Sequence, residues 1–474
     1  MSNYKPTIGI EVHLELTSNT KVFSGAINNY HGLANTQVSN VDLGYPGSLP
    51  TINNGVINTA LKAALALNMN INKEMYFDRK NYYYPDLPKG YQITQMRTPI
   101  GYEGYLMVDN KKYEIERIHI EEDTCKSIHN EKETLLNYNR SGVPLVEIVS
   151  KPVFHSDKEA MRYLEVLREL MFYLGISDCK MEEGSMRADV NVSISKTETL
   201  GTRTETKNIS SIRDVGSAIL YEIARQEEML ESGQIIEEET RKFDSLTGTT
   251  ILMRKKETGN DYRYIPEPDI PCLYLSDEQI DKTKKELVLL PNERREIYRK
   301  HNILDINIEK ILANKPISDY LNSYIDTNID FKIASNLLLG DISAYLNKTN
   351  ISIWQTKLNK EKFITLVTML EENKLTSKIV KDILSDLLER EKSIEEVLKE
   401  KNITLMDNDE ELEKIIKNIL NNYKEVVLDY QNGKDNAFKF LMGMIMKETK
   451  GSCNPKVATD TLLKLLKGNE DWLF

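Results

Sequence analysis

Hydrophobic and polar residues alternate over residues 8–16, close to the start of the chain. Ile10 and Val12 fall on one side of this segment, whereas Glu11 and His13 fall on the other. Successive side chains of a β-strand point to opposite faces of its sheet. The spacing therefore predicts a strand with an acidic polar face backed by a hydrophobic core.

The same alternation recurs in three later segments, residues 117–123, 185–194 and 203–207. One such strand alone is most simply explained by a solvated face of an antiparallel sheet. Neighbouring strands lie about 4.8 Å apart, and two carboxylates at that distance repel by roughly 3 kcal/mol at an effective dielectric constant of about 20. We therefore expect a cation on this face, and carboxylates with one or two imidazoles favour Mg²⁺ or Mn²⁺ over zinc.

The pattern divides the 474 residues into three regions. Residues 1–295 mix short alternating strands, turns and a few helices, which predicts an α+β catalytic domain with an antiparallel sheet and a polar, metal-binding face. Residues 296–404 show only helical periodicity and predict an all-α domain. Residues 405–474 predict a small helical tail domain.

Three helices are predicted in the first region, because apolar residues recur at helical spacing over residues 56–69, 156–174 and 212–231. The second of these begins with Ser156 and Glu159, which have the spacing of a capping box.

Composition excludes several classes of protein. No apolar run approaches a membrane span and the first residues lead straight into a strand, so we expect a cytoplasmic protein without membrane contact. The four cysteines form no CxxC pair, which argues against a disulfide framework and a thiolate metal site. The sequence also lacks a GxxxxGK[ST] loop, a GxGxxG fingerprint after a strand, a GxSxG motif and an amidase-like Ser/Gly-rich segment. If ammonia takes part in the reaction, another chain must make it.

The formal net charge is −11, which argues against a protein coated with nucleic acid. Residues 436–468 differ from the rest, because six lysines there face only two acidic residues. Either a basic RNA-binding patch or simple solvation of the helices explains this local balance.

Five motifs, taken in order, resemble those of a known family. They are residues 76–92 (YFDRKNYYYPDLPKGYQ), 139–148 (NRSGVPLVEI), 181–189 (MEEGSMRAD), 261–269 (DYRYIPEPD) and the tail segment 433–456. Together they are similar to the B-subunit family of glutamyl-tRNA(Gln)/aspartyl-tRNA(Asn) amidotransferases. The resemblance runs nearly from end to end of the chain.

This resemblance implies a carbon–nitrogen ligase that takes its amide nitrogen from glutamine. ATP would phosphorylate the side-chain carboxylate of mischarged Glu-tRNA(Gln) or Asp-tRNA(Asn), and ammonia would then displace the phosphate to give Gln-tRNA(Gln) or Asn-tRNA(Asn). The resemblance also implies ATP with Mg²⁺, for which Mn²⁺ is an alternative. It further implies a heterotrimer with an amidase-type A subunit, which makes the ammonia, and a small C subunit.

A carboxylate that attacks an anionic phosphate needs divalent ions and cationic side chains to neutralise the repulsion. The resemblance implies the expected ion ligands, and strand geometry supports Glu11 and His13 among them: Glu11, His13, Glu121, Glu122 and Glu147. For the remaining catalytic work, including contact with the phosphates, we expect a second set: Lys80, Glu183, Arg187, Asp189, Lys207 and Arg263. It assigns tRNA binding to the helical regions and the tail, where we expect four contacts: Lys439, Lys447, Lys450 and Lys456.

Some of these residues have an alternative role. Asp189 and Glu183 either bind a second ion or pair with Arg187. Arg263 either contacts phosphate or stacks on a neighbouring tyrosine in a rigid linker.

Two further features remain open. His119 shares a face with Glu121 and is either an ion ligand or a hydrogen-bonded structural residue. The three tyrosines at 82–84 either stack on the 3′ end of the RNA or close the core.

The chain departs from the family pattern at three places. Many relatives bind zinc through two cysteine pairs near the N-terminus, but the matching segments 23–26 and 38–42 contain no cysteine, so we expect no structural zinc. Asn137 stands where the family commonly has Asp, which puts an ion-binding role there in doubt. Met444 replaces a usual Gln, which removes one expected polar contact with RNA.

Two other classes of function fit part of the pattern. A kinase or carboxylate–amine ligase for a small molecule would use the same acidic sheet, but it would not need the long helical region with a basic end. A non-catalytic RNA-binding or assembly protein would explain the tail, but not the alternation of His and Glu on several strands. Consumption of ATP without tRNA would favour the first class, and tRNA binding without ATP turnover the second.

Overall fold

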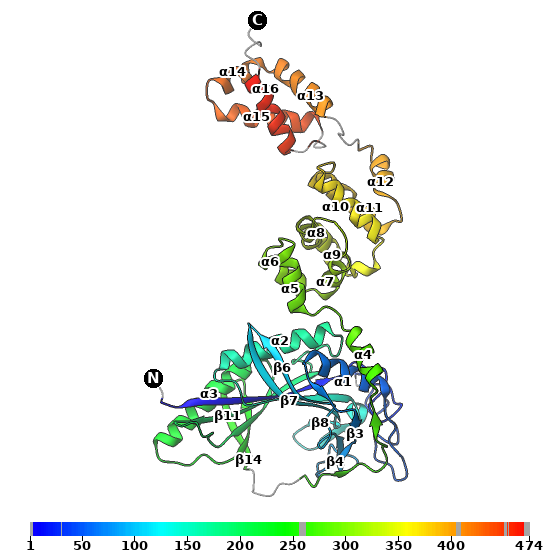
Figure 1. Cartoon of the computed structure of the whole chain (residues 1–474), viewed down its shortest axis with the longest axis vertical. Coiled ribbons are helices and arrows are strands. Elements are labelled where there is room, and N and C mark those ends of the chain that lie inside the picture. Colours follow the sequence, from blue (N-terminus) through cyan, green and yellow to red (C-terminus); the bar gives the residue numbers. More distant parts are fainter. Residues whose placement is uncertain are drawn as a thin grey trace. The chain divides into compact units, whose positions relative to one another are not determined.

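A computed structural model describes residues 3–29, 31–255, 262–403, 409–449, 453 and 455–468. The chain divides into two compact units, unit 1 (Met1–Leu290) and unit 2 (Pro291–Phe474) (Figure 1). Unit 1 contains the strands and unit 2 is helical in its described part. The α+β class with following helical regions is thereby confirmed.

The central element of unit 1 is a nine-stranded sheet with the order β14-β13-β12-β11-β1-β10-β7-β6-β2. All neighbours run antiparallel except β12 and β13, which are parallel. Its strands are β1 (Lys5–Glu15), β2 (Asn70–Ile71), β6 (Gly101–Val108), β7 (Lys111–Glu122), β10 (Pro144–Ser150), β11 (Met186–Ser195), β12 (Thr204–Ile209), β13 (Glu239–Asp244) and β14 (Thr249–Lys255).

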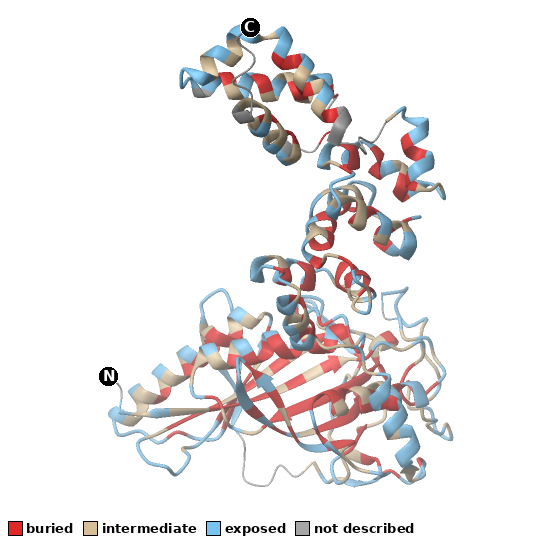
Figure 2. Cartoon of the chain, turned by 45° about the horizontal axis from the view of Figure 1, so that its top comes forward, coloured by how far each residue is buried: buried red, intermediate tan, exposed pale blue. Residues whose placement is uncertain are grey.

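The predicted alternation is present in the central strand β1. Ile10 and Val12 are fully buried in the core, whereas Glu11 and His13 are only partly buried on the opposite face. Figure 2 shows the buried residues concentrated along the strands of the large sheet. One face of the sheet is therefore hydrophobic and helix-covered, and the other is polar.

Three helices supply the hydrophobic layer: α1 (Asn54–Ala66), α2 (Asp157–Tyr173) and α3 (Ile212–Glu231). α3 packs on β11, β12 and β14, whereas α1 and α2 pack near β6 (Figure 1). All three lie where periodicity predicted helices. The predicted capping box of α2 is only half formed, because Ser156 accepts from the N–H of Glu159 while the Glu159 carboxylate accepts from the N–H of His155 instead.

Unit 1 also contains three small sheets. They are β15-β4-β5, β16-β3 and β8-β9, built from β3 (Glu74–Met75), β4 (Asp78–Asn81), β5 (Tyr91–Thr94), β8 (Lys126–His129), β9 (Thr134–Asn137), β15 (Ile265–Pro266) and β16 (Leu273–Tyr274). Arg79 on β4 holds the segment after β15 with bonds of 2.7 and 3.0 Å to Glu267 and 3.1 Å to Asp269. A 3₁₀ turn, Tyr138–Arg140, precedes β10, and α4 (Asp277–Lys285) packs against α1.

The described part of unit 2 consists of helices. They are α5 (Pro291–Lys300), α6 (Asp305–Leu312), α7 (Lys315–Asn322), α8 (Phe331–Leu337), α9 (Ser343–Thr349), α10 (Lys360–Glu371), α11 (Ser377–Glu389), α12 (Ile394–Glu400), α13 (Asp409–Asn422), α14 (Lys424–Gln431), α15 (Asp435–Glu448) and α16 (Pro455–Gly468), with a π-helical turn at Leu338–Ile342 and a 3₁₀ turn at Ile353–Gln355.

The division between the units falls at Leu290, close to the predicted boundary at 295. The second predicted boundary, at residue 404, lies outside the described residues. Helices α13 to α16 share a hydrophobic core that includes Ile416, Leu441 and Leu462.

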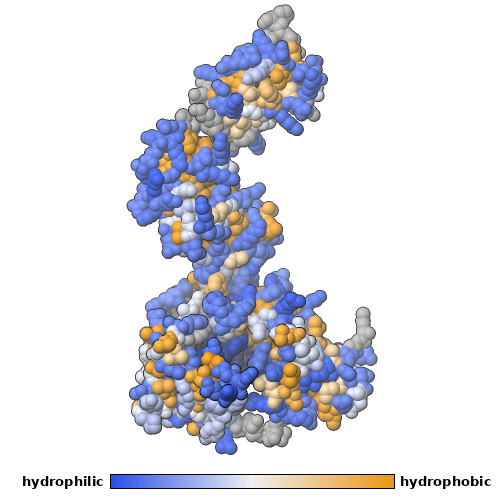
Figure 3. Space-filling view, turned by 180° about the vertical axis from the view of Figure 1, so that it is seen from behind, coloured by the Kyte–Doolittle hydropathy of each residue, from blue (hydrophilic) through white to orange (hydrophobic). Residues whose placement is uncertain are grey.

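Among the described residues, no helix is both long and apolar enough to cross a bilayer. The face seen in Figure 3 is mostly hydrophilic, with hydrophobic side chains in separate small patches.

A buried ion pair between Lys21 and Asp42 lies where segments 23–26 and 38–42 meet. Lys21 is fully buried and its Nζ lies 3.2 Å from Oδ2 of Asp42, which is 3% exposed. Asp42 also accepts from the hydroxyl of Ser24 at 2.8 Å and from the N–H of Ser39 at 2.8 Å. Here a charged hydrogen-bonded cluster connects segments 23–26 and 38–42.

Replacing Asp42 by Ala should therefore destabilise unit 1 by about 3–5 kcal/mol, because Lys21 would remain buried without its counter-ion. The double variant Lys21→Met/Asp42→Asn removes both charges and should lose clearly less stability than Asp42→Ala. Hydrogen exchange of unit 1 peptides in increasing urea measures both effects. An Asp42→Ala variant that is as stable as the wild type would contradict the expectation.

Candidate active site

The polar face of the sheet gathers side chains from five adjacent strands around the middle of β1. In the strand register, Glu11 of β1 lies opposite Asp189 of β11, and His13 lies opposite Glu147 of β10. Glu147 in turn lies opposite His119 of β7. Directly opposite residues of paired strands point to the same face, so the predicted alternation places these groups side by side.

His13, Glu121 and Glu147 form a first group able to hold a metal ion, because one ligand atom of each lies within 4.8 Å of the others. The Nε2 atom of His13 is 3.6 Å from Oε2 of Glu147 and 4.0 Å from Oε2 of Glu121. Octahedral Mg²⁺ at about 2.1 Å from its ligands separates them by roughly 3 to 4.2 Å. The donor atoms thus lie near the spacing of one coordination sphere.

Glu11, Asp189 and Glu205 form a second group, whose ligand atoms also lie within 4.8 Å of one another. Lys207 of β12 contacts this group, with its Nζ 2.5 Å from Asp189 and 2.8 Å from Glu205. Asn191 donates to Glu11 at 2.9 Å. The two groups are neighbours, because Glu11 and His13 stand two residues apart on β1.

The charges of this face are crowded. Burial raises the pKa of Glu11, and the carboxylates of Glu147, Glu205 and Asp189 raise it further, while Lys207 opposes them. A divalent cation would relieve this repulsion, and three carboxylates around one point are the oxygen ligands that such ions prefer. The second group therefore fits a hard divalent ion.

The first group is already compensated by cationic groups. Burial raises the pKa of Glu121, but Lys80 and His119 outweigh it and lower this pKa to about 2. Burial also raises the pKa of Glu147, yet His13 and His119 hold it well below its ordinary value. Both carboxylates are therefore ionised at neutral pH and available as ligands.

The Nε2 atom of His119 contacts two carboxylates. Its Nε2 lies 3.1 Å from Oε2 of Glu147 and 3.2 Å from Oε1 of Glu121. Burial lowers the pKa of this imidazole, but the two carboxylates outweigh it and raise the pKa to about 9. This geometry favours the hydrogen-bonded role left open by the sequence.

Lys80 lies beside the first group and comes from β4 of the small sheet. Burial lowers its pKa, but the charges of Glu121 and Glu147 outweigh this and raise it. Its Nζ lies 4.9 Å from the centroid of the Tyr262 ring, and the Tyr82 ring packs edge-on against Tyr262. Lys80 is thus a charged, oriented ammonium next to the carboxylates.

The structure brings together four of the five expected ion ligands, and Glu122 is the exception. Glu121 and Glu122 are adjacent on a strand and cannot share a face. Glu122 accepts from Nζ of Lys89 at 2.5 and 2.6 Å and from the N–H of Ile93 at 3.0 Å. We therefore leave Glu122 out of the ion site.

The expected catalytic residues are also divided. Asp189 and Lys207 lie in the second group, and Arg187 donates to Asp123 at 2.8 Å. Glu183 is exposed and pairs with Lys180 at 2.9 Å, apart from both groups. Arg263 is exposed in the segment before β15.

The neighbouring tyrosines differ in exposure, because Tyr82 is partly buried whereas Tyr83 and Tyr84 are 91% and 68% exposed. Closing the core is therefore not the role of Tyr83 or Tyr84.

Two contributors to the site were not predicted. Glu205 belongs to the second group, and its signal was present in the alternation of residues 203–207. Thr94 donates to Oε1 of Glu121 at 2.7 Å. It lies on the four-residue strand β5, which is too short to show a periodic pattern.

The family departures have structural roles. Asn137 ends β9, and its Oδ1 accepts from the N–H groups of Asn139 and Asn35 at 3.1 and 3.3 Å, which caps the following 3₁₀ turn. Met444 packs against the core of the tail helices. In that tail Lys439, Lys447 and Lys456 are exposed, whereas Lys450 lies outside the described residues.

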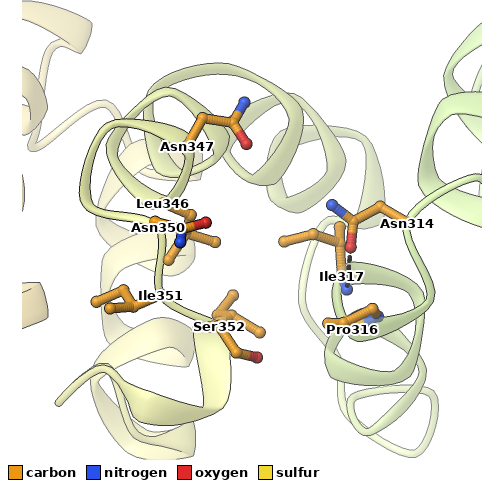
Figure 4. Close-up of a pocket in the computed structure, with 9 residues that line it drawn as sticks. Asn314, Pro316, Ile317, Leu346, Asn347, Asn350, Ile351 and Ser352 are labelled. Carbon is orange, nitrogen blue, oxygen red and sulfur yellow. Dashed lines mark hydrogen bonds between the residues drawn. The ribbon is translucent and has the colours of Figure 1, made fainter. Parts of the chain in front are cut away.

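A separate pocket of about 320 Å³ lies within unit 2, between the start of α7 and the end of α9 (Figure 4). Asn314, Asn347 and Asn350 contribute amide groups, and Asn314 caps α7 by accepting from the N–H of Ile317. The lining contains no ionisable side chain. Its chemistry therefore differs from that of the polar face in unit 1.

Comparison with known families matches both parts of the chain. The sequence model of the family described as GatB/GatE catalytic domain covers residues 6–281, which include both carboxylate groups. The chain belongs to the GatB/GatE family. A second model, described as GatB domain, covers residues 319–466 of this family member.

Similar proteins match the GatB-family chain almost from end to end. A protein of Ligilactobacillus salivarius is 41% identical over 98% of this chain and 99% of its own length. Proteins of Bacillus licheniformis and Lysinibacillus sphaericus are each 42% identical, over 98% and 97% of this chain and 99% and 98% of their own lengths. All three are named as the B subunit of an aspartyl/glutamyl-tRNA(Asn/Gln) amidotransferase.

The geometry of this GatB-family chain predicts two separable sites for divalent ions. Glu147→Gln should weaken Mn²⁺ binding at one site by roughly 10-fold or more, because it removes a charged ligand, and Asp189→Asn should do so at the other. Electron paramagnetic resonance titration of free Mn²⁺ measures both. The exposed neighbour variant Glu182→Gln should leave both affinities unchanged, and equal losses in all three variants would contradict the assignment.

Proposed function

We propose that this chain is the B subunit of a glutamine-dependent tRNA amidotransferase. In the proposed reaction, ATP phosphorylates the side-chain carboxylate of a mischarged Glu-tRNA(Gln) or Asp-tRNA(Asn). Ammonia then converts the activated group to the amide of Gln-tRNA(Gln) or Asn-tRNA(Asn). The observation that carries this proposal is that two carboxylate groups on one face of a GatB-family sheet have cationic neighbours, Lys207 from the same sheet and Lys80 from the small sheet.

The chemistry explains why such a face is needed. A substrate carboxylate oxygen bonds to the γ-phosphorus while the bond from that phosphorus to the ADP oxygen breaks. Ammonia then bonds to the carbonyl carbon, phosphate leaves, and the proton lost by nitrogen goes to the phosphate. Both partners of the first step are anionic, so positive charge must stand between them.

The residues of the two groups would hold Mg²⁺, or Mn²⁺ in its place, and a bound ion would screen the phosphates and orient them. The chain's own cations act beside it. Lys80 is held against the first group by its aromatic neighbour Tyr262, so its ammonium is positioned for a phosphate oxygen. Lys207 balances the carboxylates of the second group and can shift toward phosphate when an ion takes over that role.

Partners follow from the chemistry and from the relatives' names. The relatives are named as B subunits, which implies other subunits. Ammonia is largely protonated near neutral pH and is then not a nucleophile, so direct delivery from a glutaminase is required. We therefore propose an amidase-type A subunit and a small C subunit in a heterotrimer. Because its tRNA substrates serve translation, we place the complex in the cytoplasm.

Lys80 provides the test of the phosphoryl-transfer step. In the complex with its A and C partners, Lys80→Met should lower kcat for ATP-dependent amidation by about 100-fold or more, because an oriented charge at the phosphate is lost. Ammonium chloride replaces glutamine as the nitrogen source, so that the measurement reports on this chain rather than on the glutaminase. ADP release and aminoacyl-tRNA analysis give the two readouts.

The matched control is Lys73→Met, since Lys73 is an exposed lysine that pairs with Asp277. It should retain full activity. Full activity in Lys80→Met would remove that residue from the site. If the wild-type complex turns over ATP with neither of the two mischarged tRNAs, the proposed function is overturned.

The tail helices are the proposed tRNA contact. Lys439 and Lys447 lie on α15 and Lys456 lies on α16, and all three side chains are exposed. Recognition of a folded RNA by shape and phosphate contacts needs only such positioned cations. The family model described as GatB domain covers all three.

Replacing these three lysines by Gln should weaken tRNA binding and lower the slope of log Kd against log salt by about 2, because each phosphate contact contributes roughly 0.7 to 0.9. Filter binding at several salt concentrations measures this slope. A control triple at Lys357, Lys374 and Lys392, which already pair with glutamates, should leave the slope unchanged. Equal slopes for both triples would exclude the tail lysines as phosphate contacts.

A further inference from the structure

The strand β5 of the small sheet is attached to β7 of the large sheet by side chains. β5 pairs through its backbone only with β4 among the described strands. Toward β7 the bonds come from Gln92, Ile93 and Thr94, which are buried, and all of them end on Glu121 or Glu122. The contact between the two sheets therefore converges on the end of β7.

The two oxygens of Glu121 are occupied differently. Oε1 accepts from the hydroxyl of Thr94 at 2.7 Å and faces Nε2 of His119 at 3.2 Å. Among the hydrogen bonds of the described residues, Oε2 accepts only from Nε2 of Gln92, at 3.2 Å. Each carboxylate oxygen has two lone pairs. Oε1 thus has two polar neighbours, Thr94 and the His119 nitrogen that it shares with Glu147, whereas Oε2 has one hydrogen-bond donor.

Oε2 is also the oxygen that faces the first ion group, since it is the one that lies 4.0 Å from Nε2 of His13. A carboxylate free to rotate would present either oxygen. Here the donor on one side fixes which oxygen is left for an ion. The arrangement is that of second-layer groups around metal sites, which orient the ligand and set its affinity.

We propose that Thr94 and Gln92 are positioning residues for the ion at the first group: they fix the Glu121 carboxylate so that Oε2 is its ligand atom. This rests on the proposed ion-dependent function. The same bonds set the distance between Lys80 and the ligands, because Lys80 lies opposite Gln92 in the pairing of β4 with β5. Glu122 has a matching role, in which it docks β5 by accepting from Ile93 and Lys89.

The test measures Mn²⁺ binding in an Asp189→Asn background, so that only the first group contributes. Thr94→Val keeps the shape of the side chain but removes the donor, and we expect its Kd for Mn²⁺ to rise by about 10-fold. Thr94→Ser restores the donor and should return the Kd to within about 2-fold of the parent. The electron paramagnetic resonance spectrum of bound Mn²⁺ should change in Thr94→Val and return to that of the parent in Thr94→Ser.

The matched control is Thr206→Val. Thr206 is fully buried in β12, and its hydroxyl has no partner among the described residues. Losing that hydroxyl should leave the Kd unchanged. Gln92→Leu gives a second, independent variant, in which the Kd should rise although the Thr94 bond is intact. Thermal unfolding of each variant confirms that it is folded before it is titrated.

The outcomes separate the two proposals. If the Asp189→Asn protein, which is the parent of these variants, binds no Mn²⁺, the ion site is overturned and the proposed function with it. Parent protein that binds Mn²⁺ while Thr94→Val and Gln92→Leu bind it equally well would overturn the positioning role alone. Equal weakening by Thr94→Val and Thr206→Val, or no rescue by serine, would attribute the effect to packing and would also overturn it.

Discussion

Repulsion among carboxylates is the constraint on which the rest of unit 1 depends. Glu11, Glu121, Glu147, Asp189 and Glu205 share one face of a single sheet, and strand spacing brings their oxygens within a few ångströms. Such a face is tolerated only if cations stand among the anions. Lys80, Lys207 and His119 supply part of that charge, while burial and the neighbouring carboxylates still raise the pKa of Glu11. This excess of negative charge suits an ion-dependent reaction on anionic substrates.

Much of this arrangement follows from the sequence, because strand alternation is a strict rule. The alternation of residues 8–16 and 185–194 identified which side chains share a face, and the structure places Glu11 beside Asp189 as that rule requires. The same rule, applied to neighbours, separates Glu121 from Glu122, although the family match alone had grouped them. Alternation cannot supply the register between strands. The pairing of His13 with Glu147 depends on which strands are neighbours, and β1 lies between β11 and β10, both distant in sequence.

The small sheets were beyond sequence reasoning for a different physical reason. β5 has four residues and β15 has two, which is less than one readable period of alternation. These strands are tied to their surroundings by specific polar contacts, such as the bonds of Arg79 to Glu267 and Asp269, together with single buried side chains such as Ile93 of β5. A motif match can mark such segments as important, but it does not show which atoms meet. The roles of Thr94 and Gln92 became visible only from the distances.

The same electrostatic constraint bears on how an acidic chain binds a polyanion. Charges separated by more than about 8 to 10 Å are largely screened at physiological ionic strength, so the formal net charge of −11 does not decide whether RNA can bind. The local balance of positive and negative charge decides whether RNA can bind. On the polar face, ions and Lys80 must neutralise the carboxylates before a phosphate can approach. Residues 436–468 of the tail contain six lysines and two acidic residues, so the local charge there is already positive. An enzyme that activates a carboxylate at the end of an RNA needs both arrangements, and this chain keeps them in different units.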